Sequence, residues 1–101
     1  MRTSTLSIRL KHARLCADLS QEELGIRIGL EPASASTRIN RYELGKRMPD
    51  PELVERLAAE LNLPAAYFYA VDDAEADLLQ RYFRLAKEGK DKLNKYLAVL
   101  V

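Results

Sequence analysis

The sequence predicts an all-α fold, and three observations support this prediction. Apolar residues recur at the three- and four-residue spacing of amphipathic helices rather than in alternation. Glycine and proline are scarce, with four of each among 101 residues, and most of them stand where a helix would begin or end. Hydrophobic residues make up 48% of the chain, which favours a folded protein over a disordered one. We expect a helical domain over residues 1–70 and a C-terminal helical extension over residues 71–101.

The first helix is predicted over residues 5–17. Its expected inner apolar stripe consists of Leu6, Leu10 and Ala13, with Ala17 as a further member at the same spacing. His12 is the only histidine and is expected on the exposed face, which excludes a histidine-based metal cluster. Cys16 is the only cysteine, so no internal disulfide can form, and a packed or partly exposed thiol is expected. A reducing, cytoplasmic setting fits this cysteine usage.

The second helix is predicted over residues 21–28. Ser20 is a suitable N-cap, and Glu23 three residues later completes a capping box. Gly25 inside this helix costs about 1 kcal/mol relative to alanine, so we expect a neighbouring helix to approach it closely. Gly29 fits the left-handed position that ends a helix and starts a tight turn.

The third helix is predicted from Pro32, at the first helical position, to about Leu44, with Gly45 ending it. At 100° per residue, the helix has two unlike faces. The inner face gathers Ala35, Ile39, Tyr42 and Glu43. The outer face gathers Ala33, Ser34, Thr37, Asn40 and Arg41.

The outer face of the third helix is small, polar and cationic, and it contains no acid. Arginine can bind guanine through two hydrogen bonds, and hydroxyl and amide side chains reach base edges or phosphates. An ordinary solvated face is the alternative, but such faces usually include Glu and Asp. Two helices joined by a turn can lay the second in the major groove of DNA. We predict base contacts by Ser34, Thr37, Arg38, Asn40 and Arg41.

Further cations lie around this helix. Lys46 and Arg47 follow it directly and suit phosphate contacts with salt-dependent affinity, although they could instead complement the helix C-terminus. Gln21 begins the second helix, where backbone N–H groups can hold another phosphate. We predict phosphate contacts by Gln21, Lys46 and Arg47.

A fourth helix is predicted after Asp50, with Pro51 at its first position and Asn62 near its end. A short fifth helix follows Pro64 and carries the aromatic residues 67–69. These rings could stack on bases, as in RNA binders. Their position favours packing onto the domain instead.

Residues 74–101 carry apolar stripes that are too large for a loop. Two further helices are expected, with Gly89 interrupting between them. Apolar surface of this size usually marks an interface, and we expect it to pair with the same segment of a second subunit. Folding back to enlarge the monomer core is the alternative. The predicted dimerisation residues are Leu78, Leu79, Tyr82, Phe83, Leu93, Tyr96 and Leu97.

Charge and motif content exclude several functional classes. The net charge is +1, but residues 1–50 hold nine Lys and Arg against six Asp and Glu, which places the basic excess on the half with the two-helix unit. No apolar run approaches the roughly 20 residues that span a membrane. The acid pairs stand at helix starts, where they favour the helix dipole rather than acid–base catalysis. No phosphate-cradling glycine loop is present. We expect no enzyme, metal or cofactor.

Three segments carry a family resemblance. They read SIRLKHAR at residues 7–14, LSQEELG at residues 19–25 and YELGKRMP at residues 42–49. Together with residues 53–58 and 63–64, they resemble the Cro/C1-type, or xenobiotic-response-element, helix-turn-helix family over residues 6 to about 69. The resemblance implies a five-helix DNA-binding domain, usually dimeric on an inverted-repeat operator, with DNA contacts at Gln21, Thr37, Arg41, Lys46 and Arg47. It also implies an ion pair between Arg14 and Glu43, and the inward position of Glu43 independently requires such a partner.

The chain has about four residues more than typical members of this family between Gly29 and Glu43. Four residues turn a helix by about 400° and lengthen it by about 6 Å, so its two faces stay in phase. We therefore predict an added N-terminal turn, with residues 33–36 helical. A longer loop before an ordinary helix is the alternative.

The sequence therefore predicts a cytoplasmic, dimeric, sequence-specific DNA-binding regulator of transcription, and a repressor in particular. The alternative is an antitoxin-like or adaptor module, which would use the same helices to hold a protein partner such as a toxin.

Overall fold

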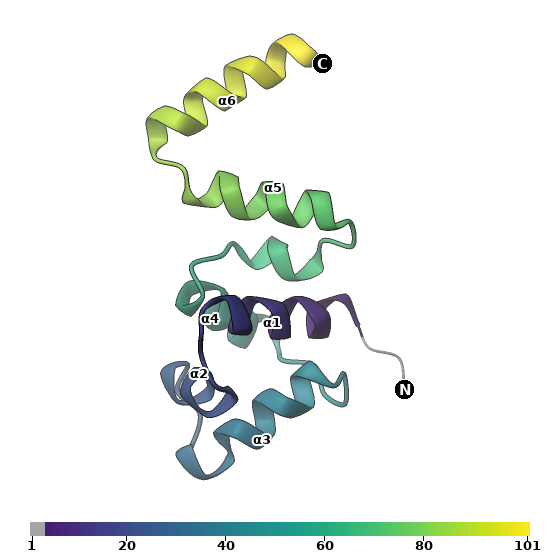
Figure 1. Ribbon diagram of the computed structural model, residues 1–101, viewed down its shortest axis with the longest axis vertical. Helices are drawn as coiled ribbons and strands as arrows, with labels where there is room; N and C mark the ends of the chain where they lie inside the picture. Colours follow the sequence, from purple (N-terminus) through teal and green to yellow (C-terminus); the bar gives the residue numbers. More distant parts are fainter. Residues whose placement is uncertain (1–3) are drawn as a thin grey trace.

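The computed structural model describes residues 4–101, and this part of the chain contains helices and connecting loops without a strand (Figure 1). The all-α prediction is confirmed. The helices are α1 (Thr5–Cys16), α2 (Gln21–Arg27), α3 (Pro32–Glu43), α4 (Pro51–Glu60), a 3-10 helix η1 (Ala65–Tyr69), α5 (Asp73–Arg84) and α6 (Lys87–Leu100).

Side-chain hydrogen bonds cap the N-termini of several of these helices. The Ser20 hydroxyl accepts a hydrogen bond from the Glu23 backbone N–H at 3.0 Å, and the Glu23 carboxylate accepts one from the Ser20 N–H at 3.0 Å. The predicted capping box is therefore present. Asp50 caps α4 through the Leu53 N–H at 2.8 Å, ahead of Pro51 at the first helical position. Asn62 follows α4 with a φ of +56° and turns the chain toward η1.

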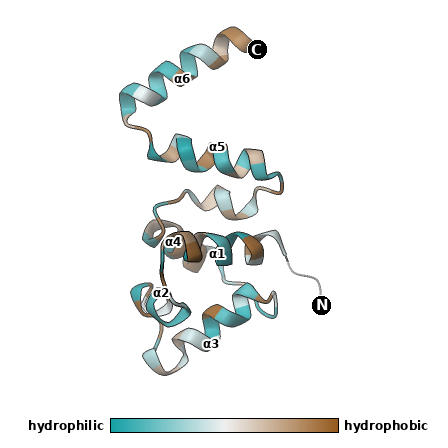
Figure 2. Ribbon diagram, in the orientation of Figure 1, coloured by the Kyte–Doolittle hydropathy of each residue, from teal (hydrophilic) through white to brown (hydrophobic). Residues whose placement is uncertain are grey.

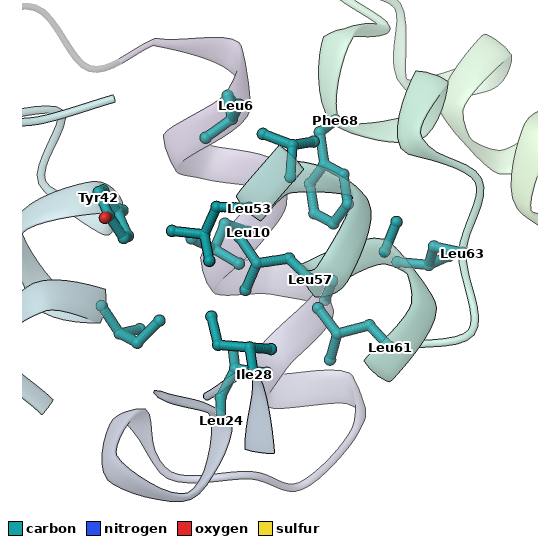
Figure 3. Packing of buried hydrophobic residues seen from close by; sticks show 14 of the residues in the cluster. Leu6, Leu10, Leu24, Ile28, Tyr42, Leu53, Leu57, Leu61, Leu63 and Phe68 are labelled. Atoms are coloured by element: carbon teal, nitrogen blue, oxygen red, sulfur yellow. The ribbon is translucent and has the colours of Figure 1, made fainter. Parts of the chain in front are cut away.

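One apolar core joins α1, α2, α3, α4 and η1 (Figure 3). The residues labelled there come from these five helices and from the chain that follows α2 and α4, and they gather around one core. Tyr67 and Phe68 of η1 are buried and pack edge to face with ring centroids 5.4 Å apart, whereas Tyr69 is exposed. Packing is therefore the role of the first two rings. The largest fully buried side chains include Leu10, Leu24, Ile39, Leu57 and Phe68.

Gly25 sets the spacing between α2 and α3. A Cβ atom added at Gly25 would lie 2.7 Å from the Cβ of Ala35, closer than two carbon atoms can pack. The predicted close approach of a neighbouring helix is confirmed. Only a residue without a side chain lets α3 come this near to α2.

Arg9 fastens the chain between η1 and α5 to α1. Its guanidinium donates hydrogen bonds to the Ala70 carbonyl oxygen at 3.0 and 2.8 Å and to the Asp73 carboxylate at 2.8 Å. Arg84 donates to the carbonyl oxygen of Asn62 at 3.1 Å from the other end of α5. Together with the buried Ala76, these bonds seat α5 on the core.

The last helix, α6, extends away from this assembly, and the molecule is elongated to 51 × 28 × 22 Å (Figure 1). Every residue of α6 is at least partly exposed. The predicted interruption at Gly89 is wrong, because Gly89 lies in the first turn of α6 and the chain instead breaks at Leu85 and Ala86 in extended conformations. The Leu85 side chain folds against Gly89, where an added Cβ would meet it at 3.1 Å. The position of Gly89 in the sequence did not indicate that the Leu85 side chain would pack against it.

Candidate nucleic-acid interface

The turn between α2 and α3 is built from local hydrogen bonds. Gly29 has a φ of +92°, as predicted for a left-handed turn residue. The Leu30 N–H donates to the Gly25 carbonyl oxygen at 2.9 Å, and the Leu30 side chain is buried. This turn fixes the direction in which α3 leaves α2.

The two faces of α3 separate as the helical wheel predicts. Ala35, Ile39, Tyr42 and Glu43 are buried. Thr37, Arg38, Asn40 and Arg41 are exposed, and Ser34 is half-buried with its hydroxyl 3.4 Å from the Glu31 carbonyl oxygen. Among the described residues of α3, the exposed face carries hydroxyl, amide and guanidinium groups but no carboxylate. Its N-terminal end carries the small exposed residues Ala33 and Ser36 beside Ser34.

Residues 33–36 lie at the N-terminal end of α3, so the prediction that they are helical is confirmed. Pro32 stands at the first helical position after Glu31, and the Ser34 N–H bonds to the Glu31 carbonyl oxygen at 3.0 Å. The added residues therefore lengthen α3 and do not extend the loop. Its exposed face gains small side chains at the end nearest α2.

A buried ion pair lies beneath α3. Arg14 Nε donates to Glu43 Oε2 at 2.6 Å, and Arg14 Nη2 donates to Glu43 Oε1 at 3.1 Å. Arg14 Nη1 also donates to the Leu19 carbonyl oxygen at 2.8 Å. The side chains are only 10% and 3% exposed, which makes this pair much less screened than a surface pair. It connects α1, the loop before α2, and the C-terminal end of α3.

Gln21 lies above this pair at the start of α2. Its Nε2 donates to Glu43 Oε1 at 3.1 Å and to Asn40 Oδ1 at 3.1 Å. Both amide donors of Gln21 are therefore used within the protein. The sequence predicted a phosphate contact for Gln21 and gave no sign of these inward bonds. A phosphate, which accepts hydrogen bonds, would have to meet the backbone N–H of Gln21.

Arginines gather at the C-terminal end of α3. Arg38 Nη2 donates to the Tyr42 hydroxyl at 2.9 Å. A groove of about 420 Å³ is lined by Arg38, Arg41, Tyr42, Arg47, Met48 and Asp50. The exposed Lys46 lies beside it, where Gly45 turns the chain with a φ of +76° and the Lys46 N–H bonds to the Arg41 carbonyl oxygen at 3.0 Å. The structure thus brings Lys46 and Arg47 next to the exposed face of α3.

Local contacts shift the pKa of Glu23 and that of Tyr67 in opposite directions. Hydrogen bonds from the Ser20 backbone N–H and hydroxyl hold the pKa of Glu23 below its usual value. Burial raises the pKa of Tyr67 in the core. His12 and Cys16 are exposed one helical turn apart on α1, with Nε2 and Sγ 3.5 Å apart. Residues 4–101 contain no cluster of three potential metal-binding side chains.

No helix within the described range is long and apolar enough to cross a membrane.

Comparisons with known proteins agree with this geometry. The sequence matches the helix-turn-helix family over residues 10–68, more than half of the chain. The crystal structure of the transcriptional regulator BswR is similar to this chain at 37% sequence identity, with a TM-score of 0.87 over 91% of each chain. Among curated proteins, no significant match is found.

Proposed function

Because the chain belongs to the helix-turn-helix family of DNA-binding regulators, we propose that it is a repressor that reads an inverted-repeat operator as a dimer. The observation that carries this proposal is the exposed face of α3, which joins hydroxyl, amide and guanidinium groups without a carboxylate. The contact of Gly25 with Ala35 and the buried pair of Arg14 with Glu43 hold that face in one orientation. A fixed helix can present donors and acceptors to base edges in the major groove.

The proposed base contacts occupy successive turns of α3. Arg41 has a fork of donors that suits guanine O6 and N7. Thr37 and Asn40 share its exposed face, and Ser34 lies near the N-terminal end that would enter the groove first. Arg38 stands at the side of this row, because its guanidinium reaches toward Tyr42. The proposed base contacts are Ser34, Thr37, Arg38, Asn40 and Arg41.

The proposed phosphate contacts surround α3. Lys46 and Arg47 are exposed directly after it, and Gln21 opens α2 on the other side with its backbone N–H. Such contacts fix the position of the helix on the duplex without reading sequence. They also release counterions, so affinity falls as salt rises.

The proposed dimer uses α5 and α6. Leu78, Tyr96 and Leu97 are 53%, 62% and 39% exposed, and α6 buries none of its residues within the described chain. A second copy would cover this apolar surface and place two α3 helices on two half-sites. The proposed dimerisation residues are Leu78, Leu79, Tyr82, Phe83, Leu93, Tyr96 and Leu97.

The same uncovered surface supports a second candidate function. A toxin-like protein partner could occupy α6 in place of a second copy, and the chain would then act as an antitoxin-like or adaptor module. The two candidates differ in what α3 does, because an adaptor needs no base contacts.

Substitution of Arg41 tests the proposed function. Selection from a random duplex pool should return an inverted-repeat motif for the wild-type protein. Arg41→Ala should weaken binding by about 1–3 kcal/mol and relax the preference at one position of each half-site. Lys92→Ala, which removes an exposed cation of α6, is the control and should leave the motif unchanged. A wild-type protein that binds every duplex equally would contradict the proposal.

A further inference from the structure

We propose that Arg9 and Arg84 are positioning residues that set the half-site spacing of the operator, because they hold α5 at one angle to α3. This inference rests on the proposed function and deepens it. The two α3 helices of a dimer reach two half-sites only if α5 holds both DNA-binding domains at the matching separation. In a duplex, each added base pair moves a half-site by about 3.4 Å and turns it by about 35° around the axis. A fixed spacing therefore requires a fixed α5.

Apolar packing attaches α5 only weakly to the DNA-binding domain. Within the described chain, Ala76 is the one buried residue of α5, and its side chain is a single methyl group. A cleft of about 340 Å³ lies between α1 and α5, where His12 of α1 and Asp77 and Gln80 of α5 are among its lining residues. A second cleft of about 100 Å³ is lined in part by Arg84. Close packing therefore does not fix the angle of α5.

Arg9 holds the N-terminal end of α5. Its guanidinium donates to the carbonyl oxygens of Ala70, at 3.0 and 2.8 Å, and Val71, at 3.2 Å. It also donates at 2.8 Å to the carboxylate of Asp73 in the first turn of α5. The Arg9 side chain is only 11% exposed, so little water competes for these bonds. Because the planar fork of an arginine fixes the direction of its partners as well as their distance, the first turn of α5 is fixed against α1.

Arg84 holds the C-terminal end of α5. Its Nε donates to the Asn62 carbonyl oxygen at 3.1 Å, and its Nη2 donates to the Leu61 carbonyl oxygen at 3.4 Å. Both carbonyl groups lie at the C-terminal end of α4, where the helix dipole favours a cation. The first turn of α5 is therefore bonded to α1, and its last turn is bonded to the end of α4.

The helix α1 connects these contacts to α3. Arg9 bonds to the start of α5, and Arg14 bonds to Glu43 at the end of α3. Five residues turn a helix by about 500°, so the two arginines leave α1 on different sides. Figure 1 shows the same arrangement, with α3 and α5 on opposite sides of α1. A displacement of α5 would therefore move the two α3 helices of a dimer relative to each other.

Binding to a series of duplexes tests the inference. Each duplex carries two copies of the selected half-site as an inverted repeat, and their separation changes by one base pair at a time. The wild-type dimer should lose about tenfold or more in affinity one base pair from the best separation, because both domains no longer bind together. Arg9→Met and Arg84→Met, made in the full chain, free one end of α5, so this loss should shrink to about threefold or less. The base preference within each half-site should stay unchanged.

Arg81→Met is the matched control, because Arg81 lies on α5 but pairs with Asp77 of the same helix. It should keep the wild-type spacing preference. Thermal unfolding and sedimentation velocity establish that each variant is a folded dimer. Arg84 is exposed, so Arg84→Met tests the inference even if Arg9→Met unfolds.

The inference is overturned if either Arg9→Met or Arg84→Met is a folded dimer that keeps the wild-type spacing preference, or if Arg81→Met broadens that preference equally. It is also overturned if the wild-type protein selects one half-site sequence but accepts every separation alike, and the proposed base reading would then stand. A wild-type protein without any motif, or one that sediments as a monomer, would instead overturn the proposed function, and this inference with it.

Discussion

The two ends of the molecule bury their apolar side chains to different extents. From α1 to η1, inward-facing leucine, isoleucine and aromatic side chains close around one core. Among the described residues of α5 and α6, only Ala76 is buried. Leucine, tyrosine and valine side chains of these helices stay in contact with solvent. The contrast is visible in Figure 2, where the far turns of α6 are hydrophobic at the tip of the molecule. The first region can orient α3 by itself, whereas the second leaves exposed apolar side chains that the proposed dimer would cover.

The largest expected effect comes from the buried ion pair of the first region. Arg14→Leu leaves the Glu43 carboxylate buried without its charged partner, which should reduce the free energy of unfolding by about 3–5 kcal/mol. Denaturant unfolding followed by circular dichroism measures this change. Arg81→Leu is the matched control, because its exposed pair with Asp77 in α5 should contribute at most about 0.5 kcal/mol. If both substitutions reduced the free energy of unfolding equally, the buried pair of the first region would contribute no more than the exposed pair of the second.

The next effect concerns association through the second region. Leu97→Glu places a carboxylate on the exposed apolar side of α6 and should separate the dimer without unfolding the monomer. Loss of the second half-site should then weaken operator binding by about 100-fold or more. Sedimentation velocity at micromolar concentration measures the association state. Lys95→Glu, on the same exposed helix, is the control. A wild-type chain that sediments as a monomer would contradict the proposed dimer.

Alanine substitutions of Gly25 in the first region and Gly89 in the second should change stability in opposite directions. Gly25→Ala forces a methyl group to within 2.7 Å of Ala35, and overpacking costs about 1–3 kcal/mol. This cost should exceed the gain of about 1 kcal/mol in helix propensity. Gly89→Ala meets the mobile end of Leu85 at 3.1 Å, which can shift, so it should stabilise by up to about 1 kcal/mol. Thermal unfolding should therefore show shifts of opposite sign.

Local chemistry made much of the first region predictable from sequence. The capping box at Ser20, the left-handed turn at Gly29 and the two faces of α3 each depend on residues within a few positions of one another. The wheel alone placed Glu43 inside, and a buried carboxylate requires a partner. The close approach at Gly25 followed because a helical glycine needs a compensating contact.

Contacts between distant segments were not predictable in this way. Arg9 bonds the chain at Ala70, and nothing in the spacing of α1 distinguishes Arg9 from a solvated arginine. The inward bonds of Gln21 depend on where α3 lies relative to α2. The break between α5 and α6 occurs at Leu85 and Ala86, residues without a helix-breaking preference, and Gly89 was chosen wrongly because its local propensity was the stronger signal.

The smallest expected effect is a dependence on pH at the start of α2. A capping box stands there, whereas α6 begins after Ala86, which makes no side-chain hydrogen bond to the helix. The folded-state pKa of Glu23 lies below its unfolded value, because the Ser20 N–H and hydroxyl bind the ionised carboxylate. Its stabilisation is therefore present above the unfolded pKa and is lost as the pH falls through the folded value. Glu23→Gln keeps the shape of the box and removes the titration, so its melting temperature should fall less between neutral and acid pH than that of the wild-type protein. Ser20→Ala, which removes the cap itself, should cost about 1 kcal/mol at neutral pH. An identical acid dependence for wild type and Glu23→Gln would mean that other carboxylates carry the whole effect.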